Sequence, residues 1–232
     1  MAIHCGLDGC SIGWVAVYRD DTTSRVWWQV LPDFSALLGW LPTLNLVAID
    51  IPIGLPDAGP RRCDLEARRL LGPRRSSVFP APIRPVVESR TYTEANEAGR
   101  RAHGKGLSKQ AWAIVPKIRE VDAALRGDAC LRDNVKEVHP ELCFTVMNAG
   151  HPMAHAKRTD AGQAERVHLL CRHFGSAVEE ALSARPSGCQ PDDLLDAFAA
   201  LWTAERVASG AARRVPEVEE RDRYGLAMEM WA

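Results

Sequence analysis

A carboxylate set in an apolar stretch is the feature that most limits how this chain can fold. Residues 44–51 (LNLVAIDI) are almost continuously apolar, which is typical of a strand covered on both faces of a sheet. Asp50 interrupts this stretch, and burying an ionised carboxylate without a partner or a cation is costly. Asp50 is therefore a candidate functional residue on its physical chemistry alone.

The first part of the chain predicts an antiparallel start to the sheet. Residues 3–18 indicate a strand, a glycine-rich bend and a second strand, and residues 25–31 indicate the return strand of a hairpin. Residues 34–41 have apolar side chains at helical spacing, and Asp33 is placed to cap this helix. The helix would act as the crossover to the apolar strand that follows it.

Two aspartates of a late helix complete a candidate acidic group. After the crossover, residues 44–51 should run parallel to the first strand, which places Asp8 and Asp50 side by side at its carboxyl end. Asp193 and Asp196 share one helix face and can approach this pair. Crowded carboxylates repel one another unless a divalent cation neutralises them, and Mg²⁺ or Mn²⁺ suits oxygen ligands. Two such ions roughly 4 Å apart would clamp the attacking water and the leaving oxygen of a phosphodiester.

Ordinary structural roles are open alternatives for several of these residues. Asp8 lies between Gly6 and Gly9, as a turn residue would. Asp192 is the expected N-cap of the late helix, and Asp193 falls in the first turn, where the helix dipole favours an acid.

Helices dominate the expected structure after residue 52. They are expected at residues 63–71, 92–103, 118–125, 161–174 and 191–209. Pro116 should stand just before the third of these helices. Residues 135–147 begin as a strand that Pro140 should end, and the alternating residues 225–231 are expected to form a final edge strand.

Charge is unevenly distributed along the chain. The 232 residues, 46% of them hydrophobic, suffice for one domain, with an insertion or lid expected at about residues 57–132. This segment has 16 Lys/Arg against 9 Asp/Glu, a balance of +7, while the remainder has 13 against 21, a balance of −8. A basic segment beside an acidic metal site suits an enzyme that acts on a polyanion, although a solvated helical surface would look the same.

Cysteine usage and hydropathy indicate a cytoplasmic protein. The seven cysteines are scattered and never spaced as Cys-x-x-Cys, which argues for reduced thiols rather than disulfides or a zinc cage. The chain starts without a signal-peptide pattern and has no apolar run long enough to cross a membrane. For the oligomeric state, a two-fold homodimer is the expectation from general frequency.

Six sequence blocks carry a family resemblance over nearly the whole chain. They are residues 6–15 (GLDGCSIGWV), 48–56 (AIDIPIGLP), 75–82 (RSSVFPAP), 110–122, 137–141 (EVHPE) and 192–197 (DDLLDA). In this order they resemble the family of domain of unknown function 429 (DUF429), described as predicted RNase H-like nucleases. The resemblance implies an α/β fold, with a mixed sheet of antiparallel hairpin strands and parallel strands flanked by helices, and a largely helical basic insertion.

The resemblance also implies roles for individual residues. It makes Asp8, Asp50 and one aspartate of the pair Asp193 and Asp196 the acidic metal ligands and suggests Glu137 as a further one. His139 is the candidate proton shuttle, with a structural hydrogen-bonded histidine as the alternative. The residues expected to line a lid over the site are Arg75, Ser76, Ser77, Gln110, Trp112, Lys117 and Glu120. Among them, Arg75 and Lys117 would contact phosphates, and Trp112 would either stack on a base or pack in the core.

These observations favour a metal-dependent nuclease that hydrolyses phosphodiester bonds of nucleic acid. Asp8-Gly9 followed by Gly13 also resembles the phosphate-binding hairpin of actin-like phosphotransferases. That superfamily duplicates its fold, and this chain has room for one copy. A third alternative is a non-catalytic module that binds an anion or nucleic acid through the basic segment.

Overall fold

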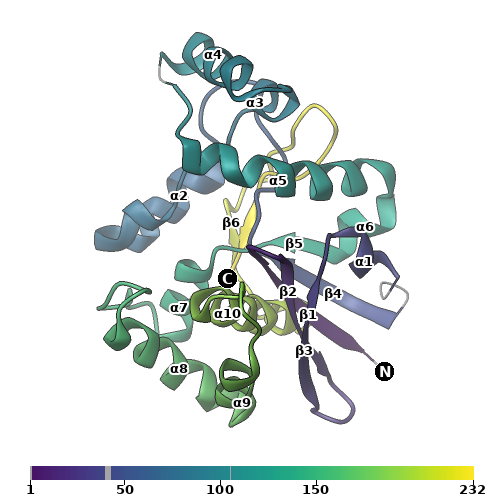
Figure 1. The fold of residues 1–232 in the computed structure, drawn as a ribbon, viewed down its shortest axis with the longest axis vertical. Helices are drawn as coiled ribbons and strands as arrows, with labels where there is room; N and C mark the ends of the chain where they lie inside the picture. The colour runs from purple at the N-terminus through teal and green to yellow at the C-terminus, as the bar shows by residue number, and fades with distance from the viewer. Residues whose placement is uncertain (1, 40–42, 105) are drawn as a thin grey trace.

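The computed structural model describes residues 2–39, 43–104 and 106–232 and is built around a five-stranded sheet (Figure 1). The strand order is β3-β2-β1-β4-β5. The strands are β1 (Ile3–Cys10), β2 (Gly13–Asp20), β3 (Val26–Leu31), β4 (Leu44–Ile49) and β5 (Val135–Glu137). The first three strands pair antiparallel, whereas β4 and β5 run parallel to β1. This mixed α/β sheet confirms the predicted fold class and has the predicted hairpin and crossover.

Helices cover both faces of the sheet. They are α1 (Ser35–Leu38), α2 (Arg62–Leu71), α3 (Arg84–Glu88), α4 (Tyr92–His103), α5 (Lys109–Gly127), α6 (Ala129–Asn134), α7 (Pro140–Met147), α8 (Asp160–Phe174), α9 (Ala177–Ala184) and α10 (Pro191–Ala208), with a 3₁₀ helix η2 (Gly72–Ser77). α1 and α5 pack with Leu7 and Ile49 on one face, while α8, α9 and α10 pack with Val15 and Ala48 on the other. No helix in the described ranges is long and apolar enough to span a membrane.

Several predicted helices are confirmed. The helices expected at 92–103, 161–174 and 191–209 are α4, α8 and α10, and the one expected at 63–71 is α2. α1 is shorter than predicted, and Asp33 accepts a hydrogen bond from the N–H of Ala36 at 2.9 Å. Residues 40 and 41 of the predicted helix lie outside the described residues.

Both proline-based boundaries in the middle of the chain need correction. Pro116 does not precede a helix but lies inside α5, which begins seven residues earlier. Its neighbours Val115 and Ile118 are fully buried against the sheet, and this packing outweighs the backbone hydrogen bond that proline removes. β5 ends at Glu137, three residues before Pro140, and Pro140 instead opens α7 at a position where a missing N–H is harmless.

The predicted C-terminal edge strand is shorter than expected. Only Met230–Trp231 forms a strand, β7, and it pairs antiparallel with β6 (Arg214–Val215) in a separate two-stranded sheet. One parallel bridge joins Trp231 to Val138, just beyond β5. The alternating pattern did not reveal β6, which is two residues long.

A glycine of β1 sets the distance between the sheet and α10. A Cβ atom at Gly6 would lie 2.1 Å from the carbonyl oxygen of Ala197 and 2.1 Å from the backbone nitrogen of Leu201. Both atoms belong to the α10 backbone, so no side-chain rotation relieves such a contact. The helix therefore lies against β1 at a distance that only glycine permits.

We expect Gly6→Ala to lower the free energy of unfolding by at least ~2 kcal/mol, because overpacking against rigid backbone costs about this much or more. Gly127→Ala is the matched control, since nothing lies within 4 Å of a Cβ built there. Urea denaturation followed by circular dichroism measures both variants. Equal stability of the two would contradict the close approach of α10.

Candidate metal centre

Asp8 and Asp50 come from neighbouring parallel strands. Leu7 of β1 pairs with Ile49 of β4, and the N–H of Asp50 donates to the carbonyl oxygen of Leu7 at 2.9 Å. Asp8 is buried within β1, whereas Asp50 is the first residue after β4 and is half-buried, not inside the strand as the sequence indicated. The predicted side-by-side placement of these aspartates is confirmed.

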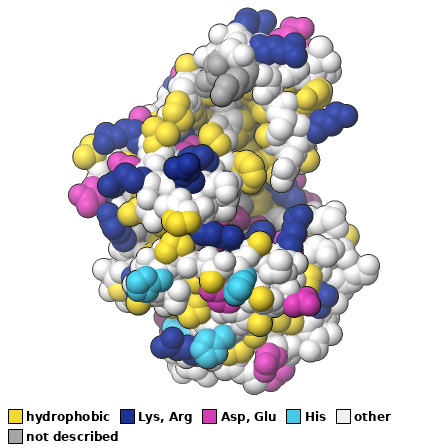
Figure 2. Space-filling model, turned by 90° about the vertical axis from the view of Figure 1, so that its left-hand side faces the viewer, with side chains coloured by type: hydrophobic (Ala, Val, Ile, Leu, Met, Phe, Trp, Pro, Cys, Tyr) yellow, Lys and Arg dark blue, Asp and Glu magenta, His cyan; other side chains and the backbone are white. Residues whose placement is uncertain are grey.

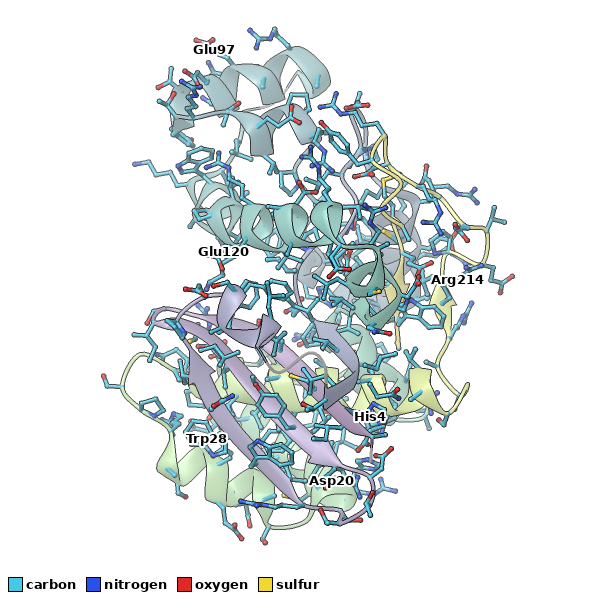
Figure 3. The ribbon with its side chains drawn as sticks, turned by 90° about the vertical axis from the view of Figure 1, so that its right-hand side faces the viewer. His4, Asp20, Trp28, Glu97, Glu120 and Arg214 are labelled. Carbon is cyan, nitrogen blue, oxygen red and sulfur yellow. The ribbon has the colours of Figure 1, made fainter. Side chains whose placement is uncertain are left out.

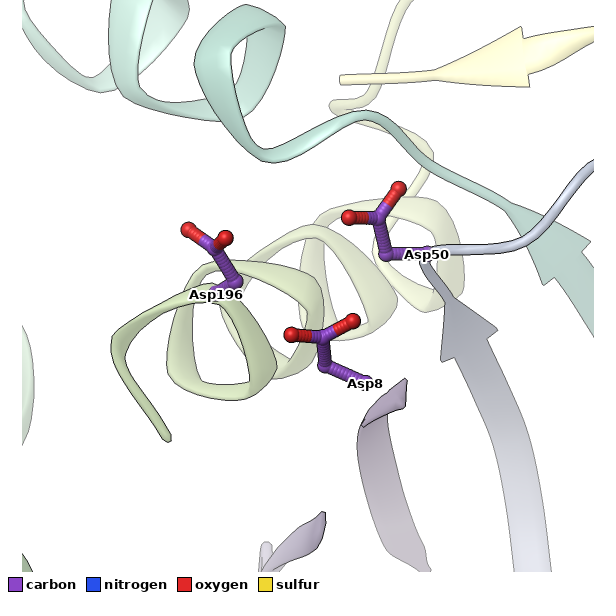
Figure 4. Close-up of side chains that lie close together, drawn as sticks. All are labelled: Asp8, Asp50 and Asp196. Carbon is purple, nitrogen blue, oxygen red and sulfur yellow. The ribbon is translucent and has the colours of Figure 1, made fainter. Parts of the chain in front are cut away.

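Asp196 brings the third carboxylate from α10. Its side chain is buried one residue before Ala197, whose backbone touches Gly6, so the close helix packing carries Asp196 over the strand ends. Figure 4 shows the three side chains converging from β1, the end of β4 and α10. One carboxylate oxygen of each of Asp8, Asp50 and Asp196 lies within 4.8 Å of the others. This set of residues is called the acidic cluster below.

The acidic cluster holds its protons more tightly than free carboxylic acids do. Burial raises the pKa of Asp50 to about 6 and, with the charge of Asp50, raises the pKa of Asp196 to about 6. Burial first, and then the charges of Asp50 and Asp196, raise the pKa of Asp8 well above its usual range. The three negative charges are therefore unfavourable together without a cation.

The donor set fits a hard divalent cation. Three carboxylate oxygens from three separate elements converge, and no nitrogen or sulfur ligand joins the groups found among the described residues. Oxygen-only sites of this kind suit Mg²⁺ or Mn²⁺.

Of the two remaining aspartates of α10 that the sequence singled out, Asp193 caps the helix and Asp192 does not. Gln190 is the N-cap, so the prediction of Asp192 in this role is wrong. Asp193 accepts the N–H of Gln190 at 2.8 Å, which makes it a capping residue. Asp193 is absent from the oxygen set formed by the described residues, although its charge contributes to the raised pKa of Asp8. Of the predicted pair, the structure brings Asp196 into the acidic cluster.

Glu137 lies outside the acidic cluster, in a buried ion pair. Its two carboxylate oxygens each accept from Arg61 at 2.7 Å, and one also accepts the N–H of Ile53 at 2.6 Å. Arg61 is paired at the same time with the fully buried Asp64. Burial raises the pKa of Glu137 to about 7, while the charge of Arg61 acts against this rise. This geometry gives Glu137 a role in joining α2 to β5.

His139 lies beside the acidic cluster, where its ring interacts electrostatically with Asp196. Its Nε2 is 3.3 Å from the carbonyl oxygen of Ser77, and its buried Nδ1 has no hydrogen-bond partner within the described part of the chain. Burial lowers the pKa of His139, which favours a neutral ring. Both alternatives for this histidine, proton shuttle and structural residue, are compatible with this position.

The predicted lid residues divide into two groups. Arg75, Ser76 and Ser77 lie in η2, where Arg75 and Ser76 are exposed and the Ser77 carbonyl faces His139. The second group, Gln110, Trp112, Lys117 and Glu120, lies on α5.

Three of the α5 residues have structural contacts. Trp112 is half-buried against the core and meets Tyr92 edge to face, so it packs in the way that the alternative interpretation expected. Lys117 donates to the carbonyl oxygen of Gly13 at 2.5 Å. Glu120 points from α5 toward the sheet (Figure 3) and accepts from Trp14 Nε1 at 3.0 Å. Gln110 is exposed.

Sequence reasoning missed Lys157. Its Nζ lies 2.6 Å from Asp196 Oδ2, and its charge lowers the pKa of Asp50 and of Asp196. Lys157 stands in a loop between α7 and α8 and belongs to no periodic pattern, so no signal in the sequence marked it.

A family model described as a protein of unknown function, DUF429, matches residues 6–221. The chain belongs to the DUF429 family. The matched range includes all three members of the acidic cluster and Lys157. No curated protein and no solved structure matches the chain.

Without metal, we expect Asp50→Asn to become more stable relative to wild type as pH rises from 5 to 7.5. A carboxyl whose pKa is raised to about 6 in the folded state stabilises while protonated and loses this contribution as pH rises through that value. The variant should melt higher at pH 7.5 in EDTA by a few degrees, equivalent to ~1–2 kcal/mol.

Differential scanning calorimetry at both pH values measures this effect, with the exposed Asp133→Asn as control. Excess Mn²⁺ should reverse the order, because only the complete acidic cluster gains full stabilisation from the ion. A melting difference that does not change between the two pH values would contradict the raised pKa assigned to Asp50.

Proposed function

We propose that this protein is a metal-dependent nuclease that hydrolyses phosphodiester bonds. The observation that carries the proposal is the convergence of Asp8, Asp50 and Asp196 at the carboxyl ends of β1 and β4. Burial raises the pKa of all three carboxylates, and neighbouring negative charge adds to the rise at Asp8 and Asp196, which supports a site that binds a cation. Their oxygen-only donor set supports Mg²⁺ or Mn²⁺ as the cofactor.

The chain's own residues account for the parts of such a reaction that a protein supplies. Asp8, Asp50 and Asp196 would hold the ion, and a bound divalent ion would supply Lewis acidity and an activated water. His139, whose buried Nδ1 has no hydrogen-bond partner among the described residues, would accept or donate a proton. Burial lowers the pKa of His139 and so favours its neutral ring, which is the form that can accept a proton.

Nucleic acid is the proposed substrate because exposed basic and aromatic groups lie beside the acidic cluster. Acidic and basic side chains gather in a hollow across the middle of one face (Figure 2). Arg75 is exposed on η2, whose carbonyl at Ser77 reaches His139. Two residues further along the chain, the Phe79 side chain is 68% exposed. Arg75 would contact a phosphate, and Phe79 takes over the stacking role first expected for Trp112.

Packing and hydrogen bonds fix the backbone on both sides of the exposed Phe79. Val78 is fully buried, and its carbonyl oxygen accepts from Arg68 at 2.5 Å. On the other side, the N–H of Ala81 donates to the buried carboxylate of Asp64 at 3.0 Å. An exposed ring that is fixed on both sides loses little entropy when a base stacks on it.

Two further proposals concern the setting of the enzyme. The seven cysteines are free thiols, which supports the proposed cytoplasmic location. A two-fold homodimer remains the proposed oligomer on general frequency alone.

We expect the purified protein with Mn²⁺ or Mg²⁺ to cleave at least one member of a panel of single-stranded, duplex, hybrid and branched nucleic acids. Asp50→Asn should lower the cleavage rate at least a hundredfold, because it removes a charge from the metal-holding set, whereas Asp133→Asn should not. Denaturing gel electrophoresis of labelled substrates provides the readout. An intact panel, or equal cleavage by Asp50→Asn, would refute the nuclease proposal and favour a non-catalytic binding module.

Arg75→Ala should weaken nucleic-acid binding several-fold at low salt and leave thermal stability unchanged, because the side chain is exposed. The slope of log affinity against log salt should fall in magnitude by about 1 for each phosphate that the variant no longer binds. Fluorescence anisotropy in EDTA measures this effect, with the exposed Arg213→Ala on the C-terminal segment as control. An unchanged slope would remove Arg75 from the binding surface.

A further inference from the structure

Lys157 is a cation built into the acidic cluster. Its Nζ lies 2.6 Å from Asp196 Oδ2 and 3.6 Å from Asp192 Oδ2. Asp8 and Asp50 are also close enough to interact with its charge. The side chain is 38% exposed, so Lys157 is partly accessible to solvent while it contacts the cluster.

The loop that carries Lys157 is fastened to α8 on the N-terminal side of the lysine. The N–H groups of Ala154 and His155 donate to the two carboxylate oxygens of Glu165, at 2.9 and 3.2 Å. The loop begins from the buried Met153, which packs in the core with α10. The approach of the chain to Lys157 is therefore defined by hydrogen bonds and packing.

The residues around Ala156 hold the loop equally closely. A Cβ atom at Gly162 would lie 2.0 Å from the carbonyl oxygen of Ala156, so this loop passes α8 at a distance that requires glycine. The hydroxyl of Thr159, the N-cap of α8, donates to the same carbonyl at 2.8 Å. Lys157 is thus positioned by backbone contacts on both sides, which is unlike a flexible surface lysine.

Other charged groups lie around the cluster. Asp192 is paired with both Arg158 and Lys157, and Asp193 caps α10 while its negative charge still acts on Asp8. Glu141, on α7, is paired with the buried Arg166. The acidic cluster itself then contributes three negative charges, against one positive charge from Lys157. Counted over the acidic cluster and Lys157 alone, one divalent ion offsets the remaining two negative charges, whereas a second would leave an excess of two positive charges at close range.

We propose that Lys157 is the second cation of this site, so that the acidic cluster binds one divalent ion and not two. This inference rests on the proposed function, because it concerns the metal content of the same site. Lys157 is a positioning residue in this scheme: it holds Asp196 and repels a second ion.

Isothermal titration calorimetry with Mn²⁺ tests the proposal on the full chain, without a nucleic-acid substrate. We expect one ion per wild-type chain. Lys157→Met should bind its first ion at least tenfold more tightly, because a competing positive charge is gone, whether or not a second ion then enters. Lys157→Arg should stay within threefold of wild type, since it keeps the charge. Arg158→Met, which removes a neighbouring exposed cation, should change the affinity much less than Lys157→Met.

The outcomes separate this inference from the nuclease proposal. Two ions per wild-type chain, or an affinity that Lys157→Met leaves unchanged or weakens, would overturn the role of Lys157 and leave the metal site intact. No Mn²⁺ binding by wild type would overturn both. If circular dichroism shows that Lys157→Met does not fold, the number of ions bound by the wild type decides. Two ions per chain would overturn the inference. One ion per chain, together with a Mn²⁺ affinity of Lys157→Arg within threefold of wild type, would support it.

Discussion

The contact between α10 and β1 at Gly6 is the constraint on which the candidate site depends. Backbone atoms of Ala197 and Leu201 occupy the space where any other residue would place its Cβ. Because the helix lies this close, the carboxylate of Asp196 reaches the strand ends that carry Asp8 and Asp50. A helix one side-chain layer further away would leave two aspartates facing solvent. The packing of the sheet and the chemistry of the site therefore have one physical origin.

Buried ion pairs join the segment 57–132 to the rest of the molecule. Arg61, the N-cap of α2, is paired with Glu137 of β5 and with Asp64 of α2, and all three side chains are buried. Arg84 makes a second such connection, between Asp122 of α5 and Asp222 near the C-terminus. Removing one partner of a buried pair leaves an uncompensated buried charge, so the loss of either partner is strongly destabilising. These pairs also keep Glu137 away from the acidic cluster.

The local patterns of the sequence predicted most of the elements around the site. The sequence predicted the hairpin, the strand β4 and the helices α4, α8 and α10. These elements could be recognised because apolar periodicity, and the glycines and prolines that mark where elements begin and end, are local properties. Predictions failed where long-range packing decides. Pro116 is tolerated inside α5 because the helix face on both sides of it is buried against the sheet, and β6 is too short to carry a pattern.

The sequence by itself determined that Asp50 belongs to an apolar strand segment, that Asp8 lies on the neighbouring strand and that a late helix presents a further aspartate. These conclusions follow from strand pairing and helical spacing. Only the tertiary structure decided that Asp196 and not Asp193 joins the pair, that Glu137 is held by Arg61, and that Lys157 enters the cluster. The physical reason is that each of these contacts connects residues far apart in the chain, at distances set by the packing of whole helices and of the loop before α8.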